Sequence, residues 1–172
     1  MKPLRLFVLA LVVLGVLAGC SRLDPEGAPA QDVEATAMIR KARIHLIAIE
    51  GRGGSDDAVG CGDRTGTLDV ELPTSEPALW GALHALLDAG KRYQGSGLYN
   101  ALANSPLKVE RIDRRGGGAR VYLTGYLELG GECDSPRVLA QLTRTATQFS
   151  DVKTAEFFLD GKPLRDLLSG KG

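Results

Sequence analysis

The sequence predicts a single α+β domain in which two main helices pack on one face of a mixed or antiparallel sheet. Two segments of helical period, rich in apolar side chains, are flanked by segments of alternating hydrophobicity. Glycine-rich turn signals separate these segments, and no internal repeat is evident. The chain of 172 residues is 44% hydrophobic and 24% charged, which is the size and composition of one globular domain.

The first twenty residues have the pattern of an export signal. Lys2 and Arg5 precede an apolar run over residues 6–18, which is too short to span a bilayer stably. Small residues then stand before Cys20, and this arrangement resembles the lipobox of bacterial lipoproteins. The resemblance implies a signal peptide over residues 1–19 and an acylated Cys20 at the mature N-terminus. The alternative is a plain secretory signal that is cleaved slightly earlier.

The charge balance excludes several kinds of partner. Without Lys2 and Arg5, 19 basic residues remain against 21 acidic ones, so the mature net charge is −2, with no long run of either sign. Nucleic-acid binding needs a concentrated basic face, so we expect no nucleic-acid partner. Electrostatic membrane docking is equally disfavoured, and the acyl chains would therefore supply the anchor. We expect residues 20–40 to be a flexible tether and residues 41–172 to be the domain.

The domain is expected to begin with two strands that a loop separates. Residues 42–50 are apolar on both faces and rich in β-branched side chains, which predicts a buried central strand. His45 inside it has no neighbour at metal-ligand spacing, which favours a structural role over a functional one. Residues 51–66 are polar and glycine-rich, but their acids lack calcium-loop spacing, so no metal or other cofactor is expected. Residues 67–72 alternate as a half-exposed strand.

A first helix is expected after this strand. Thr74 or Ser75 would cap its N-terminus, and Gly90 would end it. The apolar positions between them repeat at helical spacing and form one face: Leu79, Trp80, Leu83, Leu86 and Leu87. Trp80 is therefore expected in the core rather than in a ligand site.

The clearest hairpin joins residues 107–113 to residues 119–129, with a glycine turn at 116–118. The alternation of the second strand directs Tyr122 and Tyr126 to its outer face. This pair is either a contact surface or a simple covering of the sheet, and we favour the covering.

The last part of the domain is expected to hold a helix, a strand and a short return. Ser135 would cap a second helix that extends over residues 135–149. A strand over residues 153–159 follows, and Asp160 with Gly161 is a strong two-residue turn signal.

The cysteines predict a disulfide between Cys61 and Cys133. If Cys20 is acylated, these are the two thiols that remain, and an exported protein folds in an oxidising compartment. Each lies among glycines at the end of an element, where the backbone can reach disulfide geometry. The alternative is two separate buried thiols.

The disulfide would bring Asp63, Glu132 and Asp134 together, and we refer to these three residues as the acidic corner. Paired carboxylates hydrolyse glycosides, so a cell-wall hydrolase or a peptidoglycan-binding protein is one possible function. In a simpler interpretation, which we favour, Asp134 caps a helix, Asp63 forms a turn and Glu132 is solvated. His45 and His84 lie near no nucleophile motif, so a Ser-His-Asp triad is not expected.

Two stretches of the domain resemble the GerMN domain, which is the sporulation and spore germination domain. Gly60-Cys61-Gly62-Asp63 and the leucine-rich helix after it resemble the first half of that domain. Residues 131–137 resemble the start of its second half. The resemblance continues through three residue pairs and a turn: Gln141-Leu142, Thr145-Ala146, Gln148-Phe149 and residues 160–164. The resemblance covers about residues 41–169.

The resemblance implies a domain of bacterial surface lipoproteins without catalytic residues. We therefore expect a lipid-anchored envelope protein, held at the cell membrane or the outer membrane, that is not an enzyme. Its domain would bind another envelope protein or the cell wall. The expected contact surface is either the strand face around Tyr122 and Tyr126 or the acidic corner.

Overall fold

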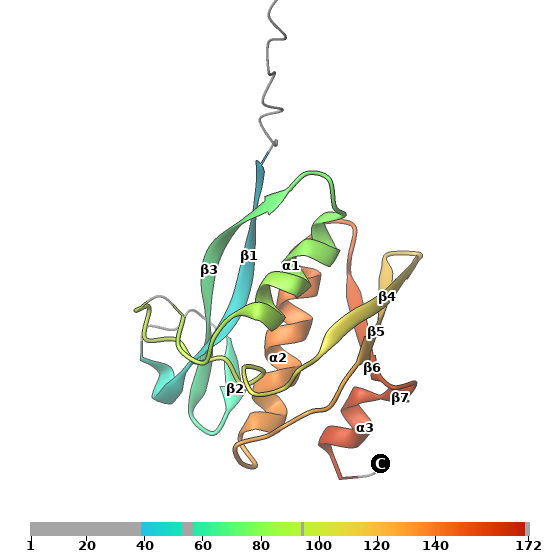
Figure 1. Ribbon diagram of the computed structural model, residues 1–172. Helices are drawn as coiled ribbons and strands as arrows, with labels where there is room; N and C mark the ends of the chain where they lie inside the picture. The colour runs from blue at the N-terminus through green and yellow to red at the C-terminus, as the bar shows by residue number, and fades with distance from the viewer. Residues whose placement is uncertain (1–38, 53–56, 94, 171–172) are drawn as a thin grey trace, which may run out of the picture. The chain divides into compact units, whose positions relative to one another are not determined.

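The computed structural model describes residues 39–52, 57–93 and 95–170 (Figure 1). These residues form seven strands in two sheets, three α-helices and one 3-10 turn, which confirms the predicted α+β class. The predicted signal peptide, Cys20 and most of the predicted tether lie outside the described residues. Among the helices of the described ranges, none is both long and apolar enough to cross a bilayer.

The first sheet is antiparallel and has the strand order β1-β3-β2. It consists of β1 (Ile39–Ala48), β2 (Ala58–Gly60) and β3 (Asp63–Pro73). The short turn η1 (Ile49–Gly51) follows β1. β1 is the segment that the sequence predicted to be a central strand. That prediction was wrong, because β1 lies at the edge of its sheet. The second half of β1 is nevertheless largely buried, since a helix covers that part of the edge.

The second sheet is mixed and has the strand order β4-β5-β6-β7. It consists of β4 (Lys108–Arg115), β5 (Gly118–Thr124), β6 (Thr154–Leu159) and β7 (Lys162–Pro163). β5 and β6 run parallel, and the other neighbours run antiparallel. The structure thus has two sheets where the sequence indicated one, because alternation reveals which face of a strand is buried but not which strand pairs with it.

Helices α1 (Ala78–Asp88) and α2 (Asp134–Thr147) lie between the two sheets in Figure 1, and α3 (Leu164–Leu168) lies near β6 and β7. Both long helices contact β1; α1 also contacts β4, and α2 also contacts β6. One continuous core fills the space between them, and its largest fully buried side chains include Ile44, Leu46, Leu83, Leu142 and Leu164.

The helix ends differ from the predicted caps. Thr74 and Ser75 lie in a turn, and α1 starts after Pro77 without a side-chain cap. Gly90 does not adopt the left-handed conformation, because the helix already ends at Ala89 in an extended conformation. The start of α2 is one residue earlier than predicted, with no side-chain cap, so Ser135 is not its N-cap.

β5 ends at Thr124 and does not continue to residue 129 as predicted. Gly125 has a φ of +117°, and a Cβ atom there would stand 2.2 Å from the Pro106 carbonyl oxygen. Only glycine permits this close approach, and the chain leaves the sheet at this point. Tyr126 is consequently 61% exposed in an irregular segment and does not form a ladder with Tyr122.

Candidate functional site

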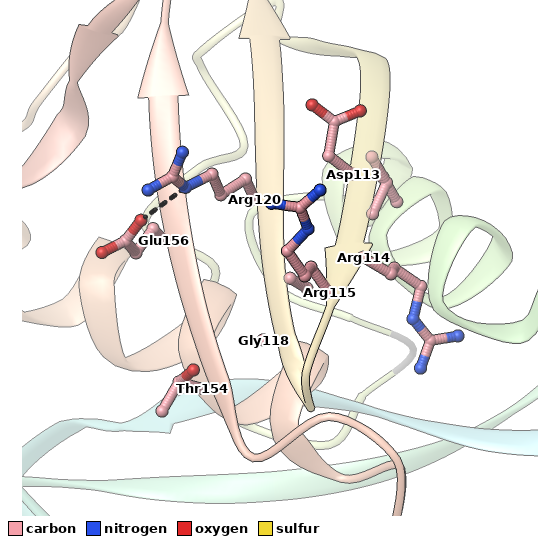
Figure 2. Close-up of a pocket in the computed structure, with 9 residues that line it drawn as sticks. Asp113, Arg114, Arg115, Gly118, Arg120, Thr154 and Glu156 are labelled. Atoms are coloured by element: carbon pink, nitrogen blue, oxygen red, sulfur yellow. Dashed lines mark hydrogen bonds and ion pairs between the residues drawn. The ribbon is translucent and has the colours of Figure 1, made fainter.

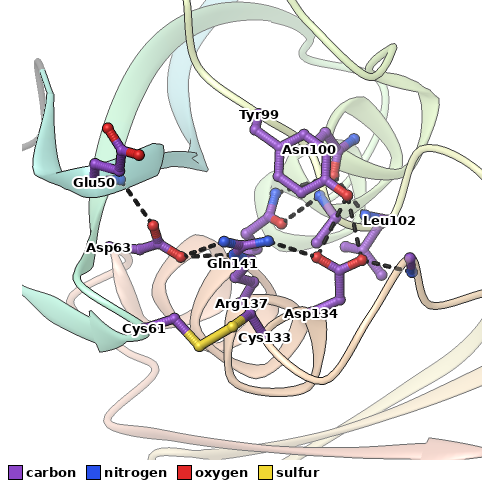
Figure 3. Close-up of polar contacts among 12 residues, drawn as sticks. Glu50, Cys61, Asp63, Tyr99, Asn100, Leu102, Cys133, Asp134, Arg137 and Gln141 are labelled. Carbon is purple, nitrogen blue, oxygen red and sulfur yellow. Dashed lines mark hydrogen bonds and ion pairs between the residues drawn. A yellow bond between two sulfur atoms is a disulfide. The ribbon is translucent and has the colours of Figure 1, made fainter.

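The disulfide predicted from the sequence is present in the structure. It joins Cys61, in the turn between β2 and β3, to Cys133 at the start of α2, and the two Cα atoms are 6.0 Å apart (Figure 3). Cys61 and Gly62 both have positive φ, which is the tight turn that brings the first sheet to the helix. The bond therefore fixes the corner at which Asp63 and Asp134 approach each other.

Arg137 lies between these two carboxylates (Figure 3). Its Nε donates to Asp63 Oδ2 at 2.7 Å, and its Nη1 donates to Asp134 Oδ1 at 3.0 Å. Both aspartates are only 2% exposed. Burial acts to lower the pKa of Arg137, but the bonds to Asp63 and Asp134 outweigh it and raise that pKa. We call Asp63, Arg137 and Asp134 the buried triad.

The remaining carboxylate oxygens of the triad are also occupied. Asp63 Oδ1 accepts the Glu50 backbone N–H at 2.9 Å, and Asp134 Oδ2 accepts the Gly130 N–H at 2.7 Å. The Tyr99 hydroxyl donates to Asp134 Oδ2 at 3.3 Å, and its pKa is raised by burial and then by the Asp134 charge. The triad thus ties η1, the chain before α2 and the loop before β4 to one helix turn.

This geometry disagrees with the catalytic interpretation of the acidic corner, and it corrects the simpler interpretation for Asp63 and Asp134 but not for the exposed Glu132. Asp63 and Asp134 are buried and ion-paired, so neither can reach a substrate as a general acid or base needs to. Glu132 is exposed and apart from the triad's ion pairs. Asp134 is the first residue of α2 and does not cap it, and Asp63 is the first residue of β3 rather than part of the turn. Within residues 39–52, 57–93 and 95–170, no group of three His, Cys, Asp or Glu side chains could hold a metal ion.

Arg137 was not singled out from the sequence, although one signal was available. It stands three residues after Asp134, and residues at this spacing are neighbours on a helix surface. The contact with Asp63 spans 74 residues, and no local pattern indicates it.

α2 also covers the outer edge of β1 with polar side chains. Thr145 Oγ1 accepts the His45 N–H at 3.0 Å, and Gln141 Nε2 donates to the His45 carbonyl at 3.2 Å. Gln148 accepts the Arg43 N–H at 2.8 Å and donates to the Arg43 carbonyl at 2.6 Å. The helix thereby takes the place of a neighbouring strand.

The same edge continues beyond the helix. Ile47 and Tyr99 exchange two backbone hydrogen bonds of 2.8 Å. Gln141 is fully buried, accepts the Ala101 N–H at 2.9 Å and donates to Asn100 Oδ1 at 3.0 Å. Residues 43, 45 and 47 of β1 are therefore bonded on this side, and this part of the edge cannot pair with another strand.

His45 points away from this ladder, and both of its ring nitrogens are buried without a hydrogen-bond partner. The pKa of His45 is lowered from 6.5 to about 4, first by burial and then by the Arg43 and Arg144 charges, while the Asp57 charge opposes this shift. The imidazole is therefore neutral near pH 7. This supports the structural role that the sequence favoured.

We expect stability to fall as the pH falls from about 6.5 to about 4. In this window the unfolded chain binds a proton at His45 that the folded chain does not, so protonation favours unfolding. His45→Gln should remove this component, and urea midpoints at pH 7 and pH 4.5 measure it. His84→Gln on α1 is the matched control. An unchanged pH dependence in His45→Gln would contradict the assignment.

The outer face of the second sheet carries a row of aromatic and charged side chains. The strand register places Arg111, Tyr122, Phe158 and Pro163 side by side on four strands. The Arg111 guanidinium lies 3.9 Å from the centre of the Tyr122 ring, and that ring stacks on Phe158 at 5.1 Å. The alternate residues, such as Val121 of β5, are buried against the helices. This row is therefore on the uncovered face.

A second row beside it consists of charges that alternate in sign. Asp113, Arg120 and Glu156 are neighbours by register on β4, β5 and β6. Arg120 Nε lies 3.1 Å from Glu156 Oε2, and both side chains are more than 60% exposed (Figure 2). A shallow hollow of about 750 Å³ lies along this row and extends to Arg115 and Thr154. We call the two rows the outer sheet face; Tyr122 belongs to it, and Tyr126 does not.

Comparison with a known structure agrees with this architecture. The tandem GerMN domains of the sporulation protein GerM from Bacillus subtilis are similar to this chain with a TM-score of 0.53 and 18% identity. The match covers 80% of this chain and 43% of that one, so this chain spans less than half of the length of that structure. A putative lipoprotein from Clostridium perfringens is similar with a TM-score of 0.41 and 13% identity, over 72% of this chain and 76% of that one. No curated protein matches the chain.

The family is identified by a match over most of the domain. The family model Germane, described as sporulation and spore germination, matches residues 62–165, which is more than half of the chain. This range contains the buried triad, the outer sheet face and Cys133, and it begins one residue after Cys61. The resemblance stated from the sequence is thereby confirmed, and the chain belongs to the Germane (sporulation and spore germination) family, with a domain of the GerMN fold.

Proposed function

We propose that this chain is a lipid-anchored bacterial envelope protein whose GerMN-type domain binds another envelope protein without catalysing a reaction. The observation that carries the proposal is the outer sheet face, on which Arg111, Tyr122 and Phe158 form a continuous row away from the helices. Tyrosine, phenylalanine and arginine are the side chains that are enriched in protein interfaces.

The shape and the chemistry of this face suit a protein partner. Tyr122 and Phe158 are half-buried and stacked, so they lose little conformational freedom when a partner covers them. The exposed ion pair of Arg120 and Glu156 beside them supplies a polar rim. The buried state of Asp63 and Asp134 supports the non-catalytic part of the proposal.

The anchor in this proposal is the acylated Cys20, at the cell membrane or the outer membrane. Stable anchoring takes more than one acyl chain, which a lipoprotein N-terminus carries. Cys20→Ser is expected to abolish labelling by an alkyne fatty acid and to release the protein or block its processing. Ser21→Ala serves as the control and should be labelled and sedimented like the natural chain. Unchanged membrane association of Cys20→Ser would refute the anchor.

Site-specific photocrosslinking in the native cell tests the interaction. A photoreactive phenylalanine at position 158 or 122 should capture a defined envelope protein, which mass spectrometry then identifies. The same group at the exposed Asp69 of β3, in the first sheet, is the control and should capture nothing specific. Equal capture from all three positions would contradict the assigned face. Cleavage of purified peptidoglycan by the domain would contradict the non-catalytic role.

A further inference from the structure

The sheet edges of the described chain differ in how they are protected against pairing. α2 and its C-cap Gln148 cover the edge of β1 at residues 43 and 45, and β2 is only three residues long. β4 has a bulge between Val109 and Arg111, and six of its eight residues are charged. Short length, bulges and charges are the means by which proteins keep edges from pairing. The first half of β6 has no bulge, and Glu156 is its one charged residue.

β7 leaves this part of β6 uncovered. It pairs only with Phe158 and Leu159, so within the described residues positions 154–157 have β5 on one side and no strand on the other. β7 is short because Pro163 ends it and α3 begins directly afterwards. The chain turns away from β6 at that point.

The backbone groups on the open side can be assigned. The Thr154 N–H points to Gly117 and the Asp160 N–H to Leu123, both toward the β5 side. Successive residues of a strand direct their backbone groups to opposite sides. Ala155 and Phe157 therefore direct theirs to the open edge, where a further strand can bond to them.

A groove borders this edge and is lined by residues of both faces of the sheet. It has a volume of about 410 Å³ and lies between β6 and the helices α2 and α3. On the inner side its lining includes Leu139 of α2 and Phe157, and on the outer side it includes Glu156, Phe158 and Pro163. Side chains of an added strand that point inward would enter this groove.

The charges of the outer face indicate what such a strand carries. Asp113, Arg120 and Glu156 alternate in sign across three neighbouring strands. Opposite charges on directly facing residues stabilise strand pairing, and like charges destabilise it. The position that faces Glu156 on a further strand therefore favours Lys or Arg.

We propose that an extended segment of a partner protein adds to residues 154–157 as a further strand, with a Lys or Arg opposite Glu156 and apolar residues on either side of it. The added strand bonds through its backbone, and its apolar side chains fill the groove. This inference rests on the proposed function and gives the chemistry of the partner. A second copy of the chain is a poorer occupant, because antiparallel pairing centred on Glu156 places two like charges opposite each other.

Short labelled peptides test the proposal on the full chain purified in detergent. The probe is acetylated Thr-Val-Lys-Val-Thr with a fluorescent label, and its control has Glu in place of Lys. By fluorescence anisotropy we expect the Lys peptide to bind about tenfold more tightly than the Glu peptide. Glu156→Lys, at an exposed position, should reverse this preference. Ala155→Pro should abolish binding of both peptides, because it removes an edge N–H and no ladder bond.

Hydrogen–deuterium exchange locates the bound peptide. Bound Lys peptide should slow exchange in the fragment that contains residues 154–157 and leave β4 unchanged. Equal binding of both peptides, absence of the reversal, or protection of β4 instead would overturn the proposal. Dimerisation of the free chain that Ala155→Pro abolishes would assign the edge to a second copy and also overturn it. If any of these results were obtained together with specific crosslinking from position 158, the proposed strand addition would be wrong but the proposed function would still be supported.

Discussion

Arg137→Ala is expected to lower the free energy of unfolding by about 3–5 kcal/mol. The substitution leaves the carboxylates of Asp63 and Asp134, each 2% exposed, without the cation that lies between them. An uncompensated buried charge is one of the few changes that cost this much, and the total stability of a domain is only about 5–15 kcal/mol. Urea unfolding followed by the fluorescence of Trp80 measures the loss, since Trp80 is the one tryptophan in the chain.

The control for this experiment is Arg144→Ala on the same helix. Arg144 pairs with Asp57 at 2.9 Å, but both side chains are nearly half exposed. Exposed pairs contribute about 0–1 kcal/mol, so this variant should remain close to the natural chain. If both variants lost the same small amount, the buried triad would not have the role that its geometry implies.

Loss of the Cys61–Cys133 disulfide is expected to cost about 2–4 kcal/mol. The bond joins residues 72 apart, so it removes much of the freedom of the unfolded chain. Urea midpoints with and without reductant give the cost, and the mass of the unreduced domain tests the bond itself. Reduction should add two hydrogens to the domain.

The double variant Cys61→Ala, Cys133→Ala is the control for reduction. It should start at the lower stability and show no further response to the reductant. A natural chain that gains no hydrogens, or whose midpoint does not move on reduction, would contradict the bond. Because the disulfide and Arg137 hold the same corner, their losses should not add when both are removed.

The parts of this fold that were predictable from the sequence are those set by neighbours in the chain. The glycine turn between β4 and β5 and the Asp160-Gly161 turn lie where the sequence predicts them. Turns of this kind need positive φ angles, which glycine, asparagine and aspartate adopt most readily, so the residues themselves indicate the turn. The apolar face of α1 was equally evident, and Leu79, Leu83 and Leu86 are buried.

The parts that were not predictable depend on contacts far apart in the chain. β1 has the composition of a central strand, and its place at an edge follows from Gln141, Thr145 and Gln148, about one hundred residues later. In the sequence, polar residues at this helical spacing cannot be distinguished from a helix face that is exposed to solvent. Arg137 was missed in part for the same reason, since one of its two partners, Asp63, lies on a strand 74 residues away.

The closure of β1 by α2 has a consequence for the order in which the chain acquires its structure. The bonds from α2 to β1 span about one hundred residues, so β1 and β3 can form their hairpin during synthesis long before their cover exists. Until then the nascent hairpin presents an apolar, β-branched edge around Ile44 and Ile47, which is the kind of surface on which chains aggregate. Fragments that stop before residue 134 should therefore be insoluble, whereas chains that include α2 should not.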